Sequence, residues 1–122
     1  MSSGPVLIAN RGEISVRIAR ALAELDIESV AIHASDDGGS LHVRAADRSV
    51  ALPGRGVAAY LDIETIVAAA KEAGCRAVHP GYGFLSESAE FAMACEKAGL
   101  VFVGPTPGML RQLGDKAAAR AL

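Results

Sequence analysis

The chain has few cysteines and aromatic residues, no excess of charge of either sign and no long hydrophobic segment. Its two cysteines, Cys75 and Cys95, have no His or Cys beside them at ligand spacing, which argues against a disulfide framework and a zinc site. No apolar run approaches the ~20 residues that cross a bilayer, and the polar start at Met1–Gly4 does not lead into a signal peptide. We therefore expect no membrane partner, cysteines that act as small core residues, and a cytoplasmic location.

The charge balance also excludes a class of partner. The 12 basic and 14 acidic residues give a formal net charge of −2, so the chain has no basic excess to neutralise a phosphate backbone, and we expect no nucleic-acid partner. The hydrophobic fraction of 51% is high because 24 of these residues are alanine. A length of 122 residues suits one domain with a real core.

Short apolar runs alternate with helical periods along the chain. Five apolar runs are predicted as strands, at residues 5–9, 29–33, 49–52, 77–79 and 100–103. Helices are predicted at residues 13–25, 41–46, 63–73 and 87–98, the last two with Asp62 and Ser86 as N-caps, and a short one after Thr106. This alternation favours an α/β fold in which helices cover both faces of a parallel sheet.

The end of the sequence lacks a helix stop signal. Asp115 is a suitable N-cap for a helix over residues 116–122, but no Gly, Pro or polar tail follows it. We therefore expect the natural chain to continue beyond Leu122.

Ligands of an open α/β sheet bind beyond the carboxyl ends of the strands, and three segments are predicted there. Residues 9–13 contain a single glycine and lack the G-x-G-x-x-G pattern of dinucleotide sites. Residues 79–88 contain two glycines between a strand and a helix. Residues 114–116 place Lys116 in the first turn of a helix.

The segment over residues 79–88 is the strongest candidate site. Gly81 and Gly83 free the backbone, so that N–H groups near a helix start could hold an anion. Tyr82 adds a ring and a hydroxyl, and Glu87 adds a carboxylate in the first helical turn. The alternative is a plain glycine turn before a capped helix, and the absence of Lys-Ser/Thr after the glycines excludes a Walker A loop.

Lys116 and the histidines also have ordinary explanations. A lysine at a helix start opposes the helix dipole unless an anion binds there, although a solvated lysine is the commoner explanation. His33, His42 and His79 share no ligand spacing, so we expect no metal site. His79 is interpreted as a hydrogen-bonded structural residue.

Charged residues form one stripe of the first long helix. Glu13, Arg17, Arg20 and Glu24 recur at helical spacing, and the pairs Glu13–Arg17 and Arg20–Glu24 can form at i,i+4. The stripe fits a solvated helix face, and its self-complementary charges also fit a two-fold interface.

Four motifs along the chain resemble those of one family. LIANRGEI at residues 7–14, HPGYGFLSE at 79–87, FVGP at 102–105 and GDK at 114–116 resemble, in order and spacing, the signatures of biotin carboxylases. The resemblance extends to Leu122, and Ser88 stands where many relatives have Asn. It implies a Rossmann-like N-terminal domain over residues 1–114, the pre-ATP-grasp domain. Residues 115–122 would then begin a linker helix toward an ATP-grasp domain.

The resemblance also implies the family's reaction. ATP and bicarbonate form carboxyphosphate, biotin on a carrier domain takes up the carboxyl group, and Mg²⁺ holds the phosphates. These cofactors are expected for the parent enzyme, whereas the chain alone is expected to be inactive and to bind none of them tightly. The alternative functions are a self-associating scaffold module and, less favoured, a generic nucleotide-binding Rossmann domain.

By motif position, the resemblance implies roles for individual residues. Lys116 would contact the ATP phosphates. A loop facing bicarbonate and biotin would contain Gly81, Tyr82, Gly83 and Glu87. A homodimer interface would include Arg17, Arg20 and Glu24. No catalytic or metal-binding residue is implied in this segment. The implied partners are the remaining carboxylase domains, the biotin carboxyl carrier domain and a second copy of the chain.

Overall fold

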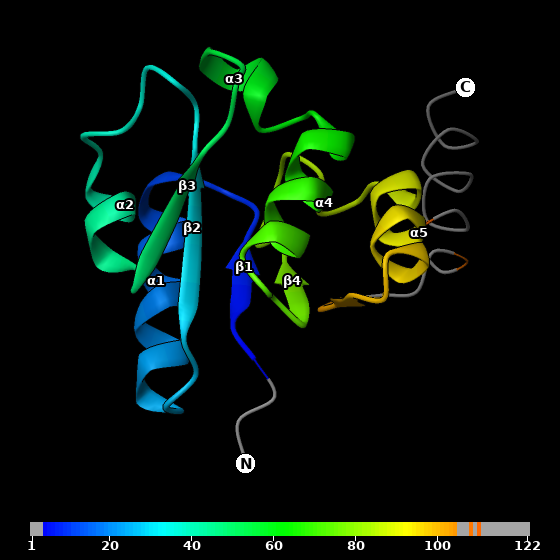
Figure 1. Ribbon diagram of the computed structural model, residues 1–122, viewed down its shortest axis with the longest axis horizontal. Coiled ribbons are helices and arrows are strands. Elements are labelled where there is room, and N and C mark those ends of the chain that lie inside the picture. Colours follow the sequence, from blue (N-terminus) through cyan, green and yellow to red (C-terminus); the bar gives the residue numbers. More distant parts are fainter. Residues whose placement is uncertain (1–3, 105–107, 109, 111–122) are drawn as a thin grey trace, which may run out of the picture.

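The computed structural model describes residues 4–104, 108 and 110. Its strands are β1 (Val6–Ile8), β2 (Ser29–His33), β3 (Arg48–Ala51), β4 (Ala77–His79) and β5 (Val101–Phe102). They form one sheet in the order β3-β2-β1-β4-β5, and every neighbouring pair is parallel (Figure 1). The predicted five-stranded parallel α/β fold is therefore confirmed. The helix predicted after Asp115, together with Lys116, lies outside the described residues, and of the short helix predicted after Thr106 only residues 108 and 110 are described, both in helical conformation.

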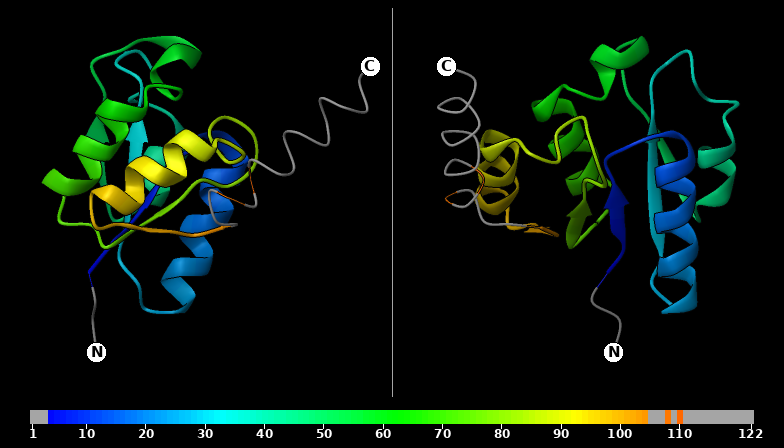
Figure 2. Two further views of the ribbon diagram at one scale, coloured as in Figure 1. Left: turned by 90° about the vertical axis from the view of Figure 1, so that its right-hand side faces the viewer. Right: turned by 180° about the vertical axis from the view of Figure 1, so that it is seen from behind.

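Helices cover both faces of this sheet. They are α1 (Gly12–Glu24), α2 (Leu41–Ala45), α3 (Gly56–Ala59), α4 (Ile63–Glu72) and α5 (Ala89–Lys97). Helices α1 and α2 lie on one face, and α4 and α5 lie on the other (Figures 1 and 2). Right-handed crossovers require this division, because the chain moves outward from β1 to β3 and then returns across β1 to β4.

Strand β1 lies in the middle of the sheet, and its register places the site. Its last residue, Ile8, pairs with Ala31 of β2 on one side and with His79 of β4 on the other. The carboxyl ends of β1 and β4 are therefore level. The loops that follow them leave the sheet side by side at the point where the strand order reverses, which is where open α/β sheets bind ligands.

Alternate residues of each strand supply two apolar clusters. On the face of α4 and α5, Leu7, Val30 and Val78 are fully buried together with Ile66 and Phe91. Because both faces of a parallel sheet are covered, the strands appear in the sequence as continuous apolar runs. Burial of each large side chain contributes about 1.5–3 kcal/mol.

The opposite face carries a smaller cluster of Val6, Ile8 and Ala77 against Ala19 and Leu22 of α1. Helix α1 buries this narrow stripe and leaves its charged residues outward. The period of the apolar residues predicted the helix, but it pointed to a stripe of Ile14, Ile18, Leu22 and Leu25, of which only Leu22 is buried. Leu25 is 68% exposed, because the helix packs on the sheet through its smaller residues.

Both cysteines behave as predicted for small core residues. Cys75 and Cys95 are buried free thiols. Burial raises the pKa of each thiol to about 11, so neither is a reactive thiolate at neutral pH.

The start of α5 differs from the prediction. Ser88, not Ser86, is the N-cap, and its Oγ accepts a hydrogen bond from the Phe91 N–H at 3.1 Å. The Ser86 N–H instead donates to the Gly83 carbonyl at 2.9 Å and closes a turn. Glu87 therefore lies just before the helix rather than in its first turn. Two serines two residues apart could both cap, and the buried position of Phe91 selects the later start.

Helix α4 begins as the sequence predicts, whereas the short helix α3 is an addition to the predicted elements. The predicted cap at Asp62 is confirmed, because its side chain accepts from the Thr65 N–H at 3.3 Å. Helix α3 was not predicted, since four residues are too few to show a helical period. None of the helices described is long and apolar enough to cross a membrane.

Candidate functional site

The candidate site lies where the loops after β1 and β4 meet. Asn10, two residues beyond β1, is completely buried there. Its Nδ2 donates to the carbonyl of Pro80 at 2.8 Å and to the carbonyl of Tyr82 at 2.7 Å. Its Oδ1 accepts from the Arg11 N–H at 2.8 Å. One side-chain amide thus ties two segments that are 70 residues apart in the sequence.

The sequence analysis included Asn10 in the segment at residues 9–13 and in the motif at residues 7–14, but it gave this residue no role of its own. The available signal was a polar residue placed directly after an uninterrupted apolar strand. A buried amide in such a position needs partners for its two donors and its acceptor.

The backbone of the 81–83 loop lies directly on this amide and on α1. A Cβ built at Gly81 would lie 2.8 Å from Ile14 Cγ2 and 2.9 Å from Asn10 Nδ2, and Gly81 has a φ of +65°. Gly83 also has a left-handed φ, of +69°. Only glycine meets both the spacing and the φ at residue 81.

The upper side of the loop faces outward. Tyr82 is 78% exposed. Among the residues that the structure describes, none accepts from the N–H groups of Tyr82, Gly83 or Phe84. Backbone N–H groups of this kind, in a segment where Gly81, Gly83 and Phe84 have positive φ, form a concave donor surface for an anion.

A groove of about 530 Å³ runs beside this loop along α1. Its lining includes Ile14, Arg17, Ile18, Leu25, His79 and Tyr82. The groove therefore combines aliphatic walls with an exposed aromatic ring and the ion pair of Arg17 with Glu13, which suits an organic ligand with a polar end.

His79 supports the same loop from the end of β4. Its Nδ1 accepts from the Gly81 N–H at 3.2 Å. Burial lowers the pKa of the imidazole, which keeps it neutral and available as an acceptor. The interpretation of His79 as a hydrogen-bonded structural residue is confirmed. Glu87, by contrast, is exposed just before α5.

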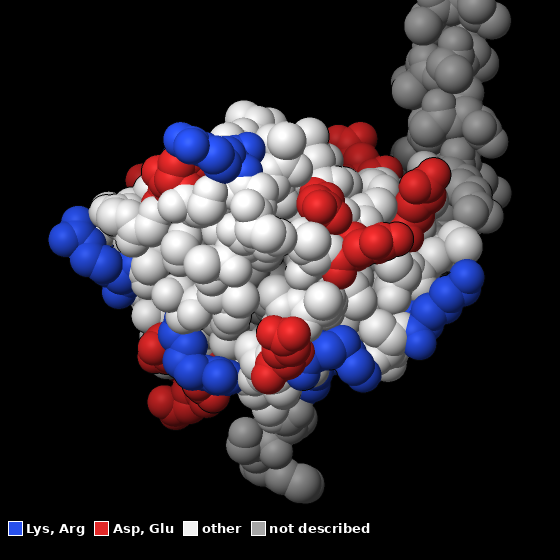
Figure 3. Space-filling model, turned by 45° about the horizontal axis from the view of Figure 1, so that its top comes forward, with Lys and Arg blue, Asp and Glu red and all other residues white. Residues whose placement is uncertain are grey.

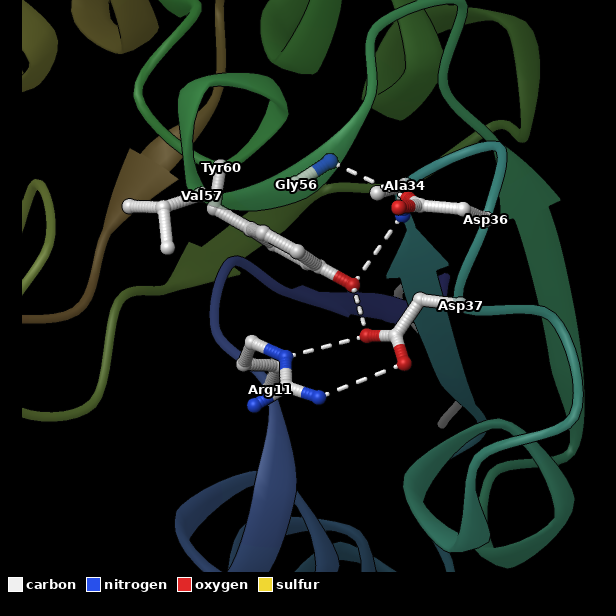
Figure 4. Close-up of a pocket in the computed structure, with 7 residues that line it drawn as sticks. All are labelled: Arg11, Ala34, Asp36, Asp37, Gly56, Val57 and Tyr60. Atoms are coloured by element: carbon white, nitrogen blue, oxygen red, sulfur yellow. Dashed lines mark hydrogen bonds and ion pairs between the residues drawn. The ribbon is translucent and has the colours of Figure 1, made fainter.

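A second cluster, unpredicted from the sequence, lies at the ends of β1, β2 and β3 (Figure 4). Arg11 binds Asp37 through two contacts, Nε–Oδ2 at 2.9 Å and Nη2–Oδ1 at 3.2 Å. The hydroxyl of the buried Tyr60 donates to Asp37 Oδ2 at 2.6 Å and accepts from the Ala34 N–H at 3.0 Å. The Ser40 hydroxyl also donates to Asp37 Oδ1.

This cluster has little capacity left for a ligand. The Arg11 hydrogen bond holds the pKa of Asp37 far below its usual range, so the carboxylate is ionised at neutral pH. An acidic residue near this position holds the ribose in dinucleotide-binding folds, but both oxygens of Asp37 are already occupied. The neighbouring cavity measures only about 170 Å³. The cluster ties three loops together and offers no evident nucleotide site.

The charged stripe of α1 is exposed as predicted. Arg17 Nε lies 3.5 Å from Glu13 Oε1, with both side chains more than two-thirds exposed, so this surface pair contributes little to stability. The described residues show no ion pair between Arg20 and Glu24. Figure 3 views the molecule obliquely toward the carboxyl end of the sheet, where charges of both signs surround a largely uncharged middle.

Comparisons with known proteins point to one family. The family model described as "Biotin carboxylase, N-terminal domain" matches residues 3–110. The mitochondrial pyruvate carboxylase of Rattus norvegicus is 52% identical over 120 residues, which are 96% of this chain and 10% of that protein. The chain thus spans about a tenth of this curated relative.

Solved structures agree with the sequence comparison. The biotin carboxylase domain of a single-chain bacterial carboxylase is 60% identical with a TM-score of 0.92, covering 98% of this chain and 28% of that one. A biotin carboxylase domain dimer of 2-oxoglutarate carboxylase from Hydrogenobacter thermophilus, in complex with MgADP, ADP and bicarbonate, is 42% identical with a TM-score of 0.85. It covers 88% of this chain and 24% of that one. The chain belongs to the biotin carboxylase N-terminal domain family.

Proposed function

We propose that this chain is the N-terminal part of an ATP-dependent biotin carboxylase, a ligase that forms a carbon–nitrogen bond. In the reaction, bicarbonate attacks the terminal phosphorus of ATP and gives carboxyphosphate and ADP. The carboxyl group then passes to a ureido nitrogen of carrier-bound biotin, and phosphate is released. Membership of the family and the MgADP and bicarbonate named for the Hydrogenobacter thermophilus relative support this proposal.

The observation that carries the proposal is the outward side of the 81–83 loop. Free N–H groups at Tyr82 and Gly83 suit the oxygen atoms of bicarbonate or of a transferring carboxyl group. The exposed Tyr82 ring and the groove beside it suit the apolar rings and side chain of biotin. Glu87 then stands near the opening of the site as an acidic residue.

Other parts of the reaction belong to residues outside the described structure. We propose that Lys116 contacts the ATP phosphates and that residues 115–122 lead from the domain at residues 1–114 toward an ATP-grasp domain. Magnesium binds elsewhere in the parent enzyme in this proposal, since no group of three potential ligands exists among the described residues. Magnesium supplies neutralisation of phosphate charge when bound.

The proposed partners are the ATP-grasp and C-terminal domains, the biotin carboxyl carrier domain and a second copy of the enzyme. Arg17, Arg20 and Glu24 lie exposed on α1 and offer a self-complementary surface for that second copy. In this proposal the enzyme has no nucleic-acid or membrane partner, and it is located in the cytoplasm.

The proposal is tested by ATP-dependent transfer of labelled bicarbonate to free biotin. The full-length enzyme should carry out the transfer, and residues 1–122 alone should not. Tyr82→Ala in the full-length enzyme should raise the KM for biotin about tenfold through lost ring contact. Leu41→Ala is the matched control, since Leu41 is an exposed apolar residue on α2, on the far side of α1 from the loop.

Two results would contradict the proposal. The first is a full-length enzyme that binds ATP yet transfers no label to biotin. The second is turnover by residues 1–122 alone.

A further inference from the structure

We propose that Asn10 is a positioning residue that sets the height and orientation of the 81–83 loop for the incoming biotin. This inference rests on the proposed function, because it concerns the same site. It adds a residue that lies beneath the loop and does not touch the substrate.

The 81–83 loop is held from the side of the sheet. The Tyr82 ring is largely exposed, and the described residues show no side-chain hydrogen bond or ring contact that fixes it. Its backbone must therefore be fixed from below. Asn10 does this at both sides of Gly81, with hydrogen bonds to the carbonyls of Pro80 and Tyr82 at 2.8 and 2.7 Å.

The side chain at residue 10 must be an amide. Two carbonyl oxygens converge on one buried point, so the residue there must supply two donors. An aspartate has almost the same shape but presents only acceptors at neutral pH, and alanine leaves the buried Pro80 carbonyl without its partner. Asn10 also accepts from the Arg11 N–H, which fixes which end of its amide carries the donors.

The position of the loop depends closely on the packing of Gly81 against Asn10. At Gly81, a Cβ would collide with Asn10 Nδ2 at 2.9 Å and with Ile14 Cγ2 at 2.8 Å. The backbone therefore rests on Asn10 with no space between them. Any shift of the amide displaces the N–H groups of Tyr82 and Gly83 directly, and errors of about 1 Å are enough to lower catalytic efficiency.

The experiment compares Asn10→Ala and Asn10→Asp with the wild type in the full-length enzyme. Two readouts are measured: KM values for free biotin and for ATP, and hydrogen exchange of the peptide covering residues 79–88. We expect both variants to raise the KM for biotin about tenfold and the exchange rate of the peptide several-fold. The KM for ATP should change less than about twofold, because ATP binds elsewhere in the proposal.

Ser29→Ala is the matched control. Ser29 is also a buried polar residue; its Oγ accepts from the Asp47 N–H at 3.1 Å, but at the amino end of β2, away from the loop. It should lower stability without changing the KM for biotin. The isosteric Asn10→Asp variant keeps the packing but replaces the two donors with a charged acceptor, whereas Asn10→Ala removes the donors without adding a charge, so an effect common to both variants reports the lost hydrogen bonds.

The inference is overturned if Asn10→Asp behaves as the wild type, or if Ser29→Ala raises the KM for biotin equally. It is also overturned if exchange in the 79–88 peptide is unchanged in both Asn10 variants. A wild-type enzyme that carboxylates no biotin would refute the proposed function, while the exchange comparison would still decide whether Asn10 holds the loop.

Discussion

At the residue scale, buried or half-buried polar side chains join loops that lie far apart in the sequence. Asn10 joins the loops after β1 and β4, and Asp37 joins Arg11 to Tyr60 across 26 and 23 residues of sequence. A buried polar group is tolerated only when its hydrogen bonds are satisfied. Such partners are set by the fold, so no local sequence pattern could predict them.

His42 is a buried residue whose bonding has a consequence for stability. It is 1% exposed, and its Nε2 lies 3.0 Å from the Ile32 carbonyl, which makes Nε2 the protonated nitrogen. Its buried Nδ1 has no partner among the described residues. Burial lowers the pKa of the imidazole, because a second proton on Nδ1 would be both desolvated and unpaired.

The direction of the pH effect follows from that lowered pKa. The unfolded chain takes up a proton as the pH falls below about 6.5, while the folded chain does not. The contribution of His42 to stability is therefore complete above the unfolded pKa and is lost as the pH falls toward the folded pKa. His79, whose pKa is also lowered by burial, acts in the same direction.

We predict that the free energy of unfolding decreases between pH 7.5 and about pH 5.5, and that His42→Gln makes this dependence shallower. Urea unfolding at several pH values measures both slopes. Cys95→Ala is the control, since the buried thiol has a pKa of about 11 and should shift the whole curve without changing its slope. Equal slopes for wild type and His42→Gln would refute the prediction.

At the element scale, the sequence predicted what depends on local pattern. All five strands appear within about two residues of their apolar runs. The inner strands β1 and β2 are buried on both faces and need continuous apolar sequence, whereas the edge strand β3 is largely exposed. The start of α5 was wrong, since Ser86 and Ser88 are equally good caps in isolation. The choice between them depends on where Phe91 packs, which is a tertiary effect.

The charged stripe of α1 gives a prediction at the same scale. In the full-length enzyme, Arg17→Glu together with Arg20→Glu should convert a dimer into a monomer, because like charges then face each other across a two-fold axis. Sedimentation velocity measures the change. Lys97→Glu is the control, since Lys97 is an exposed cation on α5 at the opposite face of the sheet. A monomeric wild type, or a double variant that stays dimeric, would contradict the proposed interface.

At the scale of the whole molecule, the order β3-β2-β1-β4-β5 creates the site. It places a strand-order reversal between β1 and β4, and the two motifs of the family that the described residues contain in full, around Asn10 and around Gly81, meet there. The sequence motifs predicted the second of these as a site. The contact between them required the sheet register, which spacing along the chain does not contain.

The most direct test of the account is a chimeric enzyme. Residues 4–110 of this chain would replace the corresponding segment of the biotin carboxylase domain of the single-chain bacterial carboxylase, which is 60% identical. We predict ATP-dependent carboxylation of free biotin with a kcat/KM within about tenfold of the recipient, and a further decrease of about tenfold in kcat/KM for biotin with Asn10→Ala. A folded chimera that binds ATP but does not carboxylate biotin would contradict the account.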